Sequence, residues 1–220
     1  MTIPLEIINL SKTYDTKEAV RNISFKVDEN EVIGILGPNG CGKTTTIGMI
    51  LGLLKPTKGK VLINGMEIEK QRVDLLNELN FISPYIELPK KLTVKQNLEV
   101  YGRLYDVKEL GIKIDYLSEK LRLNEFINKI TGELSSGQKN RVSLAKSIIN
   151  DPSVLLLDEP TASLDPETGD FVRSFLEEYQ KEKKTSILLA SHNMSEVERL
   201  CSSVLMMNKG SIIDQGTPGD

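Results

Sequence analysis

The sequence predicts an α/β fold with a mostly parallel sheet. Two continuous apolar runs, at 153–157 and 185–190, have the length and composition of strands buried on both faces, and a helical pattern at 167–182 lies between them. This alternation is typical of a parallel sheet with helices on its faces. The third observation is a change of pattern, since helical periodicity replaces the strand signals between about 84 and 150. We therefore expect one domain over 1–220 with an α-helical subdomain inserted at about 84–150.

The N-terminal part has the signals of an antiparallel β subdomain. Residues 3–10 alternate loosely between apolar and polar side chains, and 19–27 have the pattern of a second strand. Residues 59–68 have the pattern of a hairpin that turns at an Asn-Gly pair, because Asn-Gly favours the tight turns that join antiparallel strands.

The expected insertion contains three helical segments. They are 93–105, 114–126 and 138–149, and Thr93 is a candidate cap for the first of them. Strand signals return after residue 150, so the insertion separates two parts of the same sheet.

Composition excludes several classes of protein. The net charge of −3 and the sequence pI of about 5.5 give no general attraction for nucleic acid or anionic lipid. The two cysteines, Cys41 and Cys201, form no disulfide framework or zinc pattern and suit a reducing cytosol. The N-terminus lacks a signal peptide, and the apolar runs are far shorter than the roughly 20 residues that cross a bilayer. If the protein works at a membrane, another chain supplies the membrane spans.

A glycine-rich turn follows the strand expected at 32–36. Residues 37–44, GPNGCGKT, fit the pattern Gly-x-x-x-x-Gly-Lys-Ser/Thr and lead into a helix expected over about 42–52. The glycines let successive backbone amides face one anion, and the helix dipole adds positive potential there. Lys43 is placed to reach the β and γ phosphates, and the Thr44 hydroxyl to bind Mg²⁺. The alternative interpretation is an ordinary glycine turn before a helix.

Two carboxylates end the apolar strand that follows the helical segment. In VLLLDE, residues 154–159, Asp158 and Glu159 lie where ligands bind at the carboxyl ends of parallel strands. We expect Asp158 to hold Mg²⁺ and Glu159 to polarise the attacking water. Acidic residues also end strands as solvated groups, but the glycine-rich loop favours the metal interpretation.

A second candidate anion site lies at LSSGQ, residues 134–138. The Ser135 side chain, the amides of Ser136 and Gly137, and the start of a helix at Gln138 provide hydrogen-bond donors and a positive helix end. The same residues also form a cap for the helix at 138–149.

The order GPNGCGKT, LSSGQ, LLLDEP, SLD and a later histidine resembles the ATP-binding cassette (ABC) family across almost the whole chain. The usual pentapeptide of that family is LSGGQ, and Ser136 departs from it. The resemblance implies a P-loop NTPase core, ATP and Mg²⁺ as ligands, and hydrolysis of ATP. It also implies that 134–138 contacts ATP bound mainly by a second subunit.

The resemblance gives roles to three further residues. Asp165 matches the family's dimer-contact loop, and His192, the single histidine, matches the residue that contacts the γ-phosphate. Tyr14 matches the aromatic residue that stacks on adenine, although a strand-edge tyrosine is the alternative.

One position departs from the family. A glutamine normally begins the helical insertion and links Mg²⁺ to the membrane partner, but here Pro84 aligns with it and no glutamine occurs between Gln71 and Gln96. Ser83 or a backbone carbonyl is the candidate substitute. Among ABC proteins, the segments GLLKPTKG and LTVKQNLEVYGRLY are most similar to ATPases that serve ABC-2 type exporters.

We therefore expect the protein to bind and hydrolyse ATP and so to supply energy to a membrane transporter. Two alternative functions are considered. The expected partners are a second copy or a homologous ATPase subunit and separate transmembrane permease subunits, with no nucleic acid, at the cytoplasmic face of the cell membrane. The first alternative is a soluble ABC ATPase that acts on nucleic acid or ribosomes, and the second is a nucleotide sensor without turnover. Relatives usually continue beyond the QGTPGD end, so we expect a shortened C-terminus.

The expected catalytic residues are Lys43, Glu159 and His192, and the expected metal ligands are Thr44 and Asp158. The expected nucleotide-binding residues are Tyr14, Gly37, Pro38, Asn39, Gly40, Cys41, Gly42, Lys43, Thr44, Thr45, Ser135, Ser136, Gly137 and Gln138. For the Cys41 thiol two interpretations stay open, a small filler in the loop or a thiol made reactive by the helix N-terminus and Lys43.

Overall fold

The computed structural model describes residues 2–84 and 86–219. Its larger sheet has six strands in the order β10-β9-β3-β8-β7-β6. All neighbouring pairs in this sheet are parallel except β9 and β10, so the predicted mostly parallel sheet is confirmed. The strands are β3 (Val32–Leu36), β6 (Leu79–Ile82), β7 (Val154–Asp158), β8 (Ser186–Ser191), β9 (Ser203–Asn208) and β10 (Ser211–Gly216).

The smaller sheet is antiparallel, with the order β2-β1-β4-β5. Its strands are β1 (Leu5–Tyr14), β2 (Lys17–Val27), β4 (Lys58–Ile63) and β5 (Met66–Glu67). Asn64 and Gly65, with φ of 49° and 77°, turn the chain between β4 and β5 as a hairpin turn with positive φ at both central residues requires. The predicted N-terminal β subdomain is confirmed, and β1 continues four residues beyond the predicted strand.

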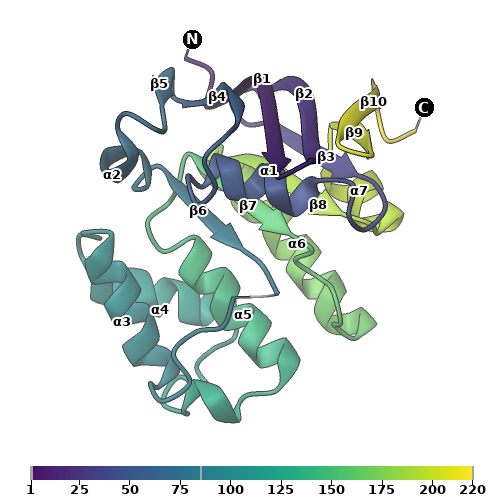
Figure 1. Ribbon diagram of the computed structural model, residues 1–220. Coiled ribbons are helices and arrows are strands. Elements are labelled where there is room, and N and C mark those ends of the chain that lie inside the picture. The colour runs from purple at the N-terminus through teal and green to yellow at the C-terminus, as the bar shows by residue number, and fades with distance from the viewer. Residues whose placement is uncertain (1, 85, 220) are drawn as a thin grey trace.

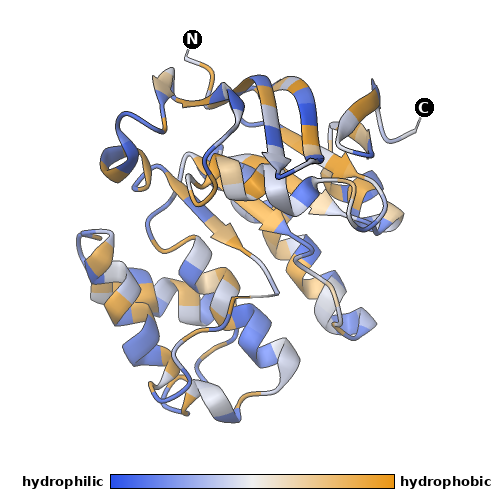
Figure 2. Cartoon of the chain, in the orientation of Figure 1, coloured by the Kyte–Doolittle hydropathy of each residue, from blue (hydrophilic) through white to orange (hydrophobic). Residues whose placement is uncertain are grey.

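The large sheet separates two hydrophobic clusters. Val154 and Leu156 of β7 contact the cluster that contains α1 (Lys43–Ile50) and the small sheet, whereas Leu155 and Leu157 contact the opposite cluster. This alternation follows from the two-residue period of a strand. It explains why the run is apolar without interruption, because both faces of β7 are covered. Figure 2 shows the strands of this sheet as largely hydrophobic.

Two helices cover the second face, α6 (Pro166–Lys183) and α7 (Met194–Leu200). Figure 1 shows α1 and the small sheet on one side of the large sheet, and the helices α3, α4 and α5 grouped away from the small sheet. These three helices are α3 (Val94–Leu104), α4 (Leu110–Lys120) and α5 (Ser136–Ser147), and a 3₁₀ turn at Thr131–Glu133 precedes α5.

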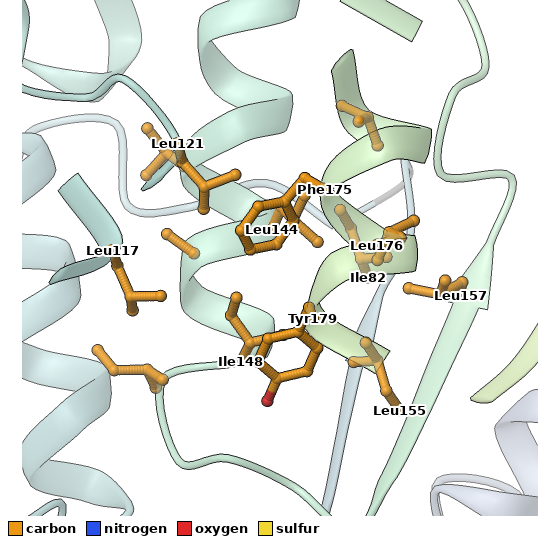
Figure 3. Close-up of a cluster of buried hydrophobic side chains, with 14 of the residues drawn as sticks. Ile82, Leu117, Leu121, Leu144, Ile148, Leu155, Leu157, Phe175, Leu176 and Tyr179 are labelled. Atoms are coloured by element: carbon orange, nitrogen blue, oxygen red, sulfur yellow. The ribbon is translucent and has the colours of Figure 1, made fainter. Parts of the chain in front are cut away.

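The helical segment shares its core with the sheet. Leu117 of α4 and Ile148 after α5 belong to the same buried cluster as Tyr179 of α6 (Figure 3). Thr93 caps α3 as predicted, because its hydroxyl accepts from the Gln96 amide at 3.1 Å and the Gln96 side chain accepts from the Thr93 amide at 2.9 Å. Along the chain, the helical segment lies between β6 and β7.

Candidate functional site

The glycine-rich loop lies between β3 and α1, at the carboxyl end of the parallel sheet. A Cβ on Gly37 would lie 2.1 Å from the Met207 carbonyl oxygen, so this position accepts no side chain without movement of β9. A Cβ on Gly42, which has a φ of 114°, would lie 2.7 Å from the Ala19 carbonyl oxygen. Around Gly40 the space is open. The loop is therefore held tightly on its inner side and leaves its outer side to a ligand.

Lys43 folds back over this loop. Its side chain is buried, and Nζ donates to the carbonyl oxygens of Gly37 at 2.6 Å and Pro38 at 3.4 Å. Buried ammonium groups need acceptors, and the loop carbonyls supply them. The cation thus lies against the backbone of the loop, and the next residue, Thr44, is exposed.

Asp158 ends β7 and is only 3% exposed. Burial raises the pKa of its carboxyl group, and repulsion from Glu159 raises it further, while the hydroxyls of Ser83 and Thr44 and the charge of Lys43 oppose the shift. The Ser83 hydroxyl donates to Asp158 Oδ2 at 3.4 Å. A cation at this position would favour the ionised carboxylate, and the oxygen donors of Asp158 and Thr44 suit the hard ion Mg²⁺.

Glu159 and His192 meet across the ends of two neighbouring strands. His192 Nδ1 lies 2.7 Å from Glu159 Oε1, with the histidine side chain 62% exposed and the glutamate side chain 13% exposed. Glu159 has a φ of 50°, which ends the strand, and its amide donates to the Ala190 carbonyl oxygen at 2.8 Å. The structure therefore brings together two residues that are 33 positions apart in sequence.

A cavity of about 510 Å³ is lined by part of the predicted phosphate loop, whereas Gly37, Pro38 and Cys41 do not line it. Tyr14, at the end of β1, lies on its wall with 44% of its surface exposed, and Lys12 Nζ lies 5.1 Å from the centre of its ring. The residues that line the cavity are Tyr14, Lys17, Glu18, Ala19, Arg21, Asn39, Gly40, Gly42, Lys43, Thr44, Thr45, Asp158, Glu159, Lys209 and Gly210.

Several of these residues have no local signal in the sequence. Ala19 and Arg21 come from β2, and Lys209 and Gly210 from the turn between β9 and β10. They join the site because the Gly210 amide donates to the Cys41 carbonyl oxygen at 2.9 Å and the Gly210 carbonyl oxygen accepts from the Arg21 amide at 2.7 Å.

The LSSGQ residues lie outside this cavity. Ser135 caps α5, since its hydroxyl accepts from the Gln138 amide at 3.3 Å and Gln138 Oε1 accepts from the Ser135 amide at 3.0 Å. The cap interpretation is therefore confirmed. Ser136 lines a separate cavity of about 280 Å³ together with Ser83 and Glu159, and a Cβ on Gly137 would lie 3.3 Å from the Thr168 side chain. Within one chain, the two predicted anion sites therefore face different cavities, and Glu159 lines both of them.

The structure also shows the surroundings of the three remaining positions, Asp165, Pro84 and Cys41. Asp165 caps α6 by accepting from the Thr168 amide at 2.9 Å, and this hydrogen bond lowers the pKa of its carboxyl group. Pro84 is exposed and follows Ser83 directly. Cys41 is 3% exposed and packs in the hydrophobic cluster with α1, which favours its interpretation as a small filler.

The fold and the loop define a nucleotide-binding protein of the P-loop NTPase class. Known proteins narrow this class, because residues 20–162 match the family described as ABC transporter. The chain belongs to this family. It is an ATP-binding ABC ATPase subunit, and the family implies that it hydrolyses ATP. Among residues 2–84 and 86–219, no helix has the length and apolar character needed to cross a membrane.

Three known proteins illustrate the similarity. The chain is 37% identical to the ABC transporter ATP-binding protein NatA of Bacillus subtilis, over 90% of this chain and 82% of that protein. It is 37% identical to the Nod factor export ATP-binding protein I of Rhizobium johnstonii, over 98% of this chain and 70% of that protein. A solved ATP-binding subunit of an ABC transporter superposes with a TM-score of 0.90 at 28% identity, over 98% of this chain and 90% of that one. The predicted fold class is confirmed by this match.

Proposed function

We propose that this chain drives a membrane ABC exporter as one half of an ATP-bound dimer. Its partners would be a second copy or a homologous ATPase subunit, and separate transmembrane permease subunits at the cytoplasmic face of the membrane. The observation that carries the proposal is the separation of the two anion sites within one chain. Residues 39–45 of the loop, without Cys41, line one cavity, and Ser136 of the pentapeptide lines another that meets the first at Glu159. A second chain would bring its own pentapeptide to the ATP held by this loop.

The phosphate site supports binding of Mg-ATP. The amides of residues 37–44 and the charge of Lys43 would hold the β and γ phosphates, and Tyr14 would stack on the adenine ring. Thr44 and Asp158 would hold Mg²⁺, which neutralises charge on the phosphates when it is bound. The ammonium of Lys43 would exchange its loop carbonyls for phosphate oxygens.

Glu159 and His192 would carry the chemistry. The Glu159 carboxylate, which is largely shielded from solvent, would accept a proton from the attacking water. A proton on His192 Nδ1 would donate to Glu159 Oε1 and orient this carboxylate, which leaves Nε2 for the γ-phosphate. Closure of the dimer upon ATP binding would drive the permease, because ATP favours the closed state.

The pentapeptide would complete the site of the partner chain. Ser135 and Ser136 are exposed at the start of α5, where the helix end is positive. Asp165 would lie in the contact between the two chains. The exporter direction is supported by the similarity to a protein named for Nod factor export.

The experiment is size-exclusion chromatography with light scattering of Glu159→Gln in Mg-ATP. Loss of the general base should lower turnover by roughly 10²–10⁴. ATP should still bind, so the closed dimer should accumulate while the wild-type protein stays mostly monomeric. The double variant Glu159→Gln with Ser135→Arg should be monomeric, since arginine would crowd the opposing phosphate site.

Glu119→Gln provides the matched control, because Glu119 is exposed on α4 and its loss changes the charge equally. Glu119→Gln should behave as the wild type does. If Glu159→Gln hydrolyses ATP at the wild-type rate, another residue is the base. If it loses hydrolysis but stays monomeric at saturating ATP, the shared-site mechanism is wrong.

A further inference from the structure

A buried carboxylate lies in the first turn of α7. Glu196 is 1% exposed, and both of its oxygen atoms accept hydrogen bonds from hydroxyl groups. Oε1 accepts from Thr161 Oγ1 at 2.8 Å, and Oε2 accepts from Ser191 Oγ at 2.7 Å. The one side chain therefore connects the segment that follows β7 with the last residue of β8.

These two segments carry the residues of the proposed chemistry. Thr161 follows Glu159 by two positions, and Ser191 directly precedes His192. Ser191 Oγ also accepts from the Asn193 amide at 3.0 Å, which holds the chain on the other side of His192. Each residue of the Glu159–His192 contact of 2.7 Å is thus within two positions of a hydroxyl group that the Glu196 carboxylate binds.

Burial of a carboxylate is costly, so its position needs a physical reason. Hydrogen bonds to a charged acceptor are stronger than neutral ones, and the bonds of 2.8 and 2.7 Å give each carboxylate oxygen a hydroxyl donor. An apolar side chain of similar volume would fill the same space without the cost of desolvation. Unlike such an apolar side chain, Glu196 fixes the distance between the segment after β7 and the end of β8.

We propose that Glu196 is a positioning residue for ATP hydrolysis. It holds the ends of β7 and β8 in the arrangement that places Glu159 against His192, and it touches neither nucleotide nor water itself. This inference rests on the proposed roles of Glu159 and His192.

The test compares substitutions of Glu196 by steady-state ATP hydrolysis. Glu196→Met fills the volume but accepts no hydroxyl bonds, and its kcat should fall about tenfold or more, because small misplacements of catalytic groups have effects of this size. The KM for ATP should stay within about twofold, since residues 37–44 are untouched. Glu196→Gln keeps an acceptor and the shape, so it should recover most of the lost kcat. The matched control Glu198→Gln, at an exposed position of the same helix, should keep the wild-type rate.

Single removal of the two hydroxyl groups gives an independent measurement. Thr161→Val and Ser191→Ala should each lower kcat, and Thr161→Val should have little further effect when it is combined with Glu196→Met. Ser191→Ala should retain part of its effect in that background, because it also removes the acceptor of the Asn193 amide. These two variants also test the inference if the Glu196 variants do not fold.

The outcomes separate this inference from the proposed function. If Glu196→Met keeps the wild-type kcat, or if the losses from Glu196→Met and Thr161→Val add fully, Glu196 is not a positioning residue. If it raises the KM for ATP as much as it lowers kcat, its role is in binding or stability and the inference is wrong. If Glu159→Gln keeps full activity, the proposed function fails first, whatever the Glu196 variants do.

Discussion

Lys146 is a buried cation on α5, and its replacement by methionine should change how stability depends on pH. The side chain is 8% exposed, and Nζ donates to Asn80 Oδ1 at 3.1 Å and to the Phe81 carbonyl oxygen at 3.4 Å. The rings of Phe81 and Tyr101 have their centres 4.7 and 5.3 Å from Nζ. Burial lowers the pKa of Lys146 from its ordinary value of 10.5 to about 8.

The direction in which stability changes with pH follows from the pKa values of Lys146 in the folded and the unfolded chain. Between pH 8 and 10.5 the unfolded chain keeps the Lys146 proton while the folded chain loses it, so the free energy of unfolding rises with pH across this window. Below about pH 8, Lys146 is charged in both the folded and the unfolded chain, and the folded state carries the full cost of burying this charge. At about 1.4 kcal/mol per pH unit, the interval between the two values corresponds to about 3 kcal/mol.

Methionine removes the penalty and both hydrogen bonds of Nζ, the one to Asn80 Oδ1 and the longer one to the Phe81 carbonyl oxygen. Asn80 Oδ1 still accepts from the Phe81 amide at 2.8 Å, so the loss of these bonds costs only about 1 kcal/mol in all. Lys146→Met should therefore be up to about 2 kcal/mol more stable than the wild type at pH 7.

The assay is urea denaturation of both proteins at pH 7, 8, 9 and 10, with Lys108→Met as an exposed control. Titrations at other sites cancel in the difference between the two proteins. The advantage of Lys146→Met should shrink as the pH rises from 8 to 10, while Lys108→Met shows no such trend. An advantage that stays constant or grows with pH would refute the reasoning.

Three further predictions concern the nucleotide site and its loop. Lys43→Ala should weaken ATP binding by about 2–5 kcal/mol in calorimetric titration, because it removes the buried cation of the loop, and near-native affinity would contradict the assignment. Cys41 should react slowly with small maleimides both with and without Mg-ATP, because its thiol is buried, and fast labelling of the folded protein would show that the loop opens. Pro84→Gln should change the turnover stimulated by a reconstituted permease more than the basal turnover. If both rates are unchanged, the segment at Pro84 does not couple the nucleotide to the permease.

The elements predicted correctly are those with complete local signals. The apolar run of β7, the Asn-Gly turn and the capping box at Thr93 each need only adjacent residues. The short strand β6 was not predicted, because Asn80 interrupts its apolar pattern. Asn80 can be buried because Lys146 and Asn150, at the C-terminal end of the helical segment, form hydrogen bonds with its side chain. Strands β9 and β10, helix α2 (Arg72–Leu75) and helix α7 were also not predicted.

The candidate site also has parts that local sequence predicts and parts that depend on the tertiary fold. The glycine-rich loop, the two carboxylates and LSSGQ are contiguous motifs, so the sequence alone indicates them. The contact between Glu159 and His192 depends on the register of β7 against β8, which pairs Asp158 with Ala190. Glu196 gave no signal as a partner of either segment, since its hydroxyl partners are 35 and 5 positions away in sequence.

Strand order explains why these distant residues form one site. β3, β8 and β7 are consecutive neighbours in the sheet and run parallel, so their carboxyl ends meet at one edge. The residues that follow these ends are Gly37 of the phosphate loop, His192 and Glu159. Each strand is buried, and its register is therefore strongly specified. The part of the chain between β6 and β7 reaches this edge at two points, because the Ser83 hydroxyl donates to Asp158 Oδ2 at 3.4 Å and Asn140 Nδ2 donates to the Pro160 carbonyl oxygen at 2.7 Å. A movement of the helical segment would thus be felt at Asp158 and directly after Glu159, which is the property that the proposed coupling between nucleotide and permease requires.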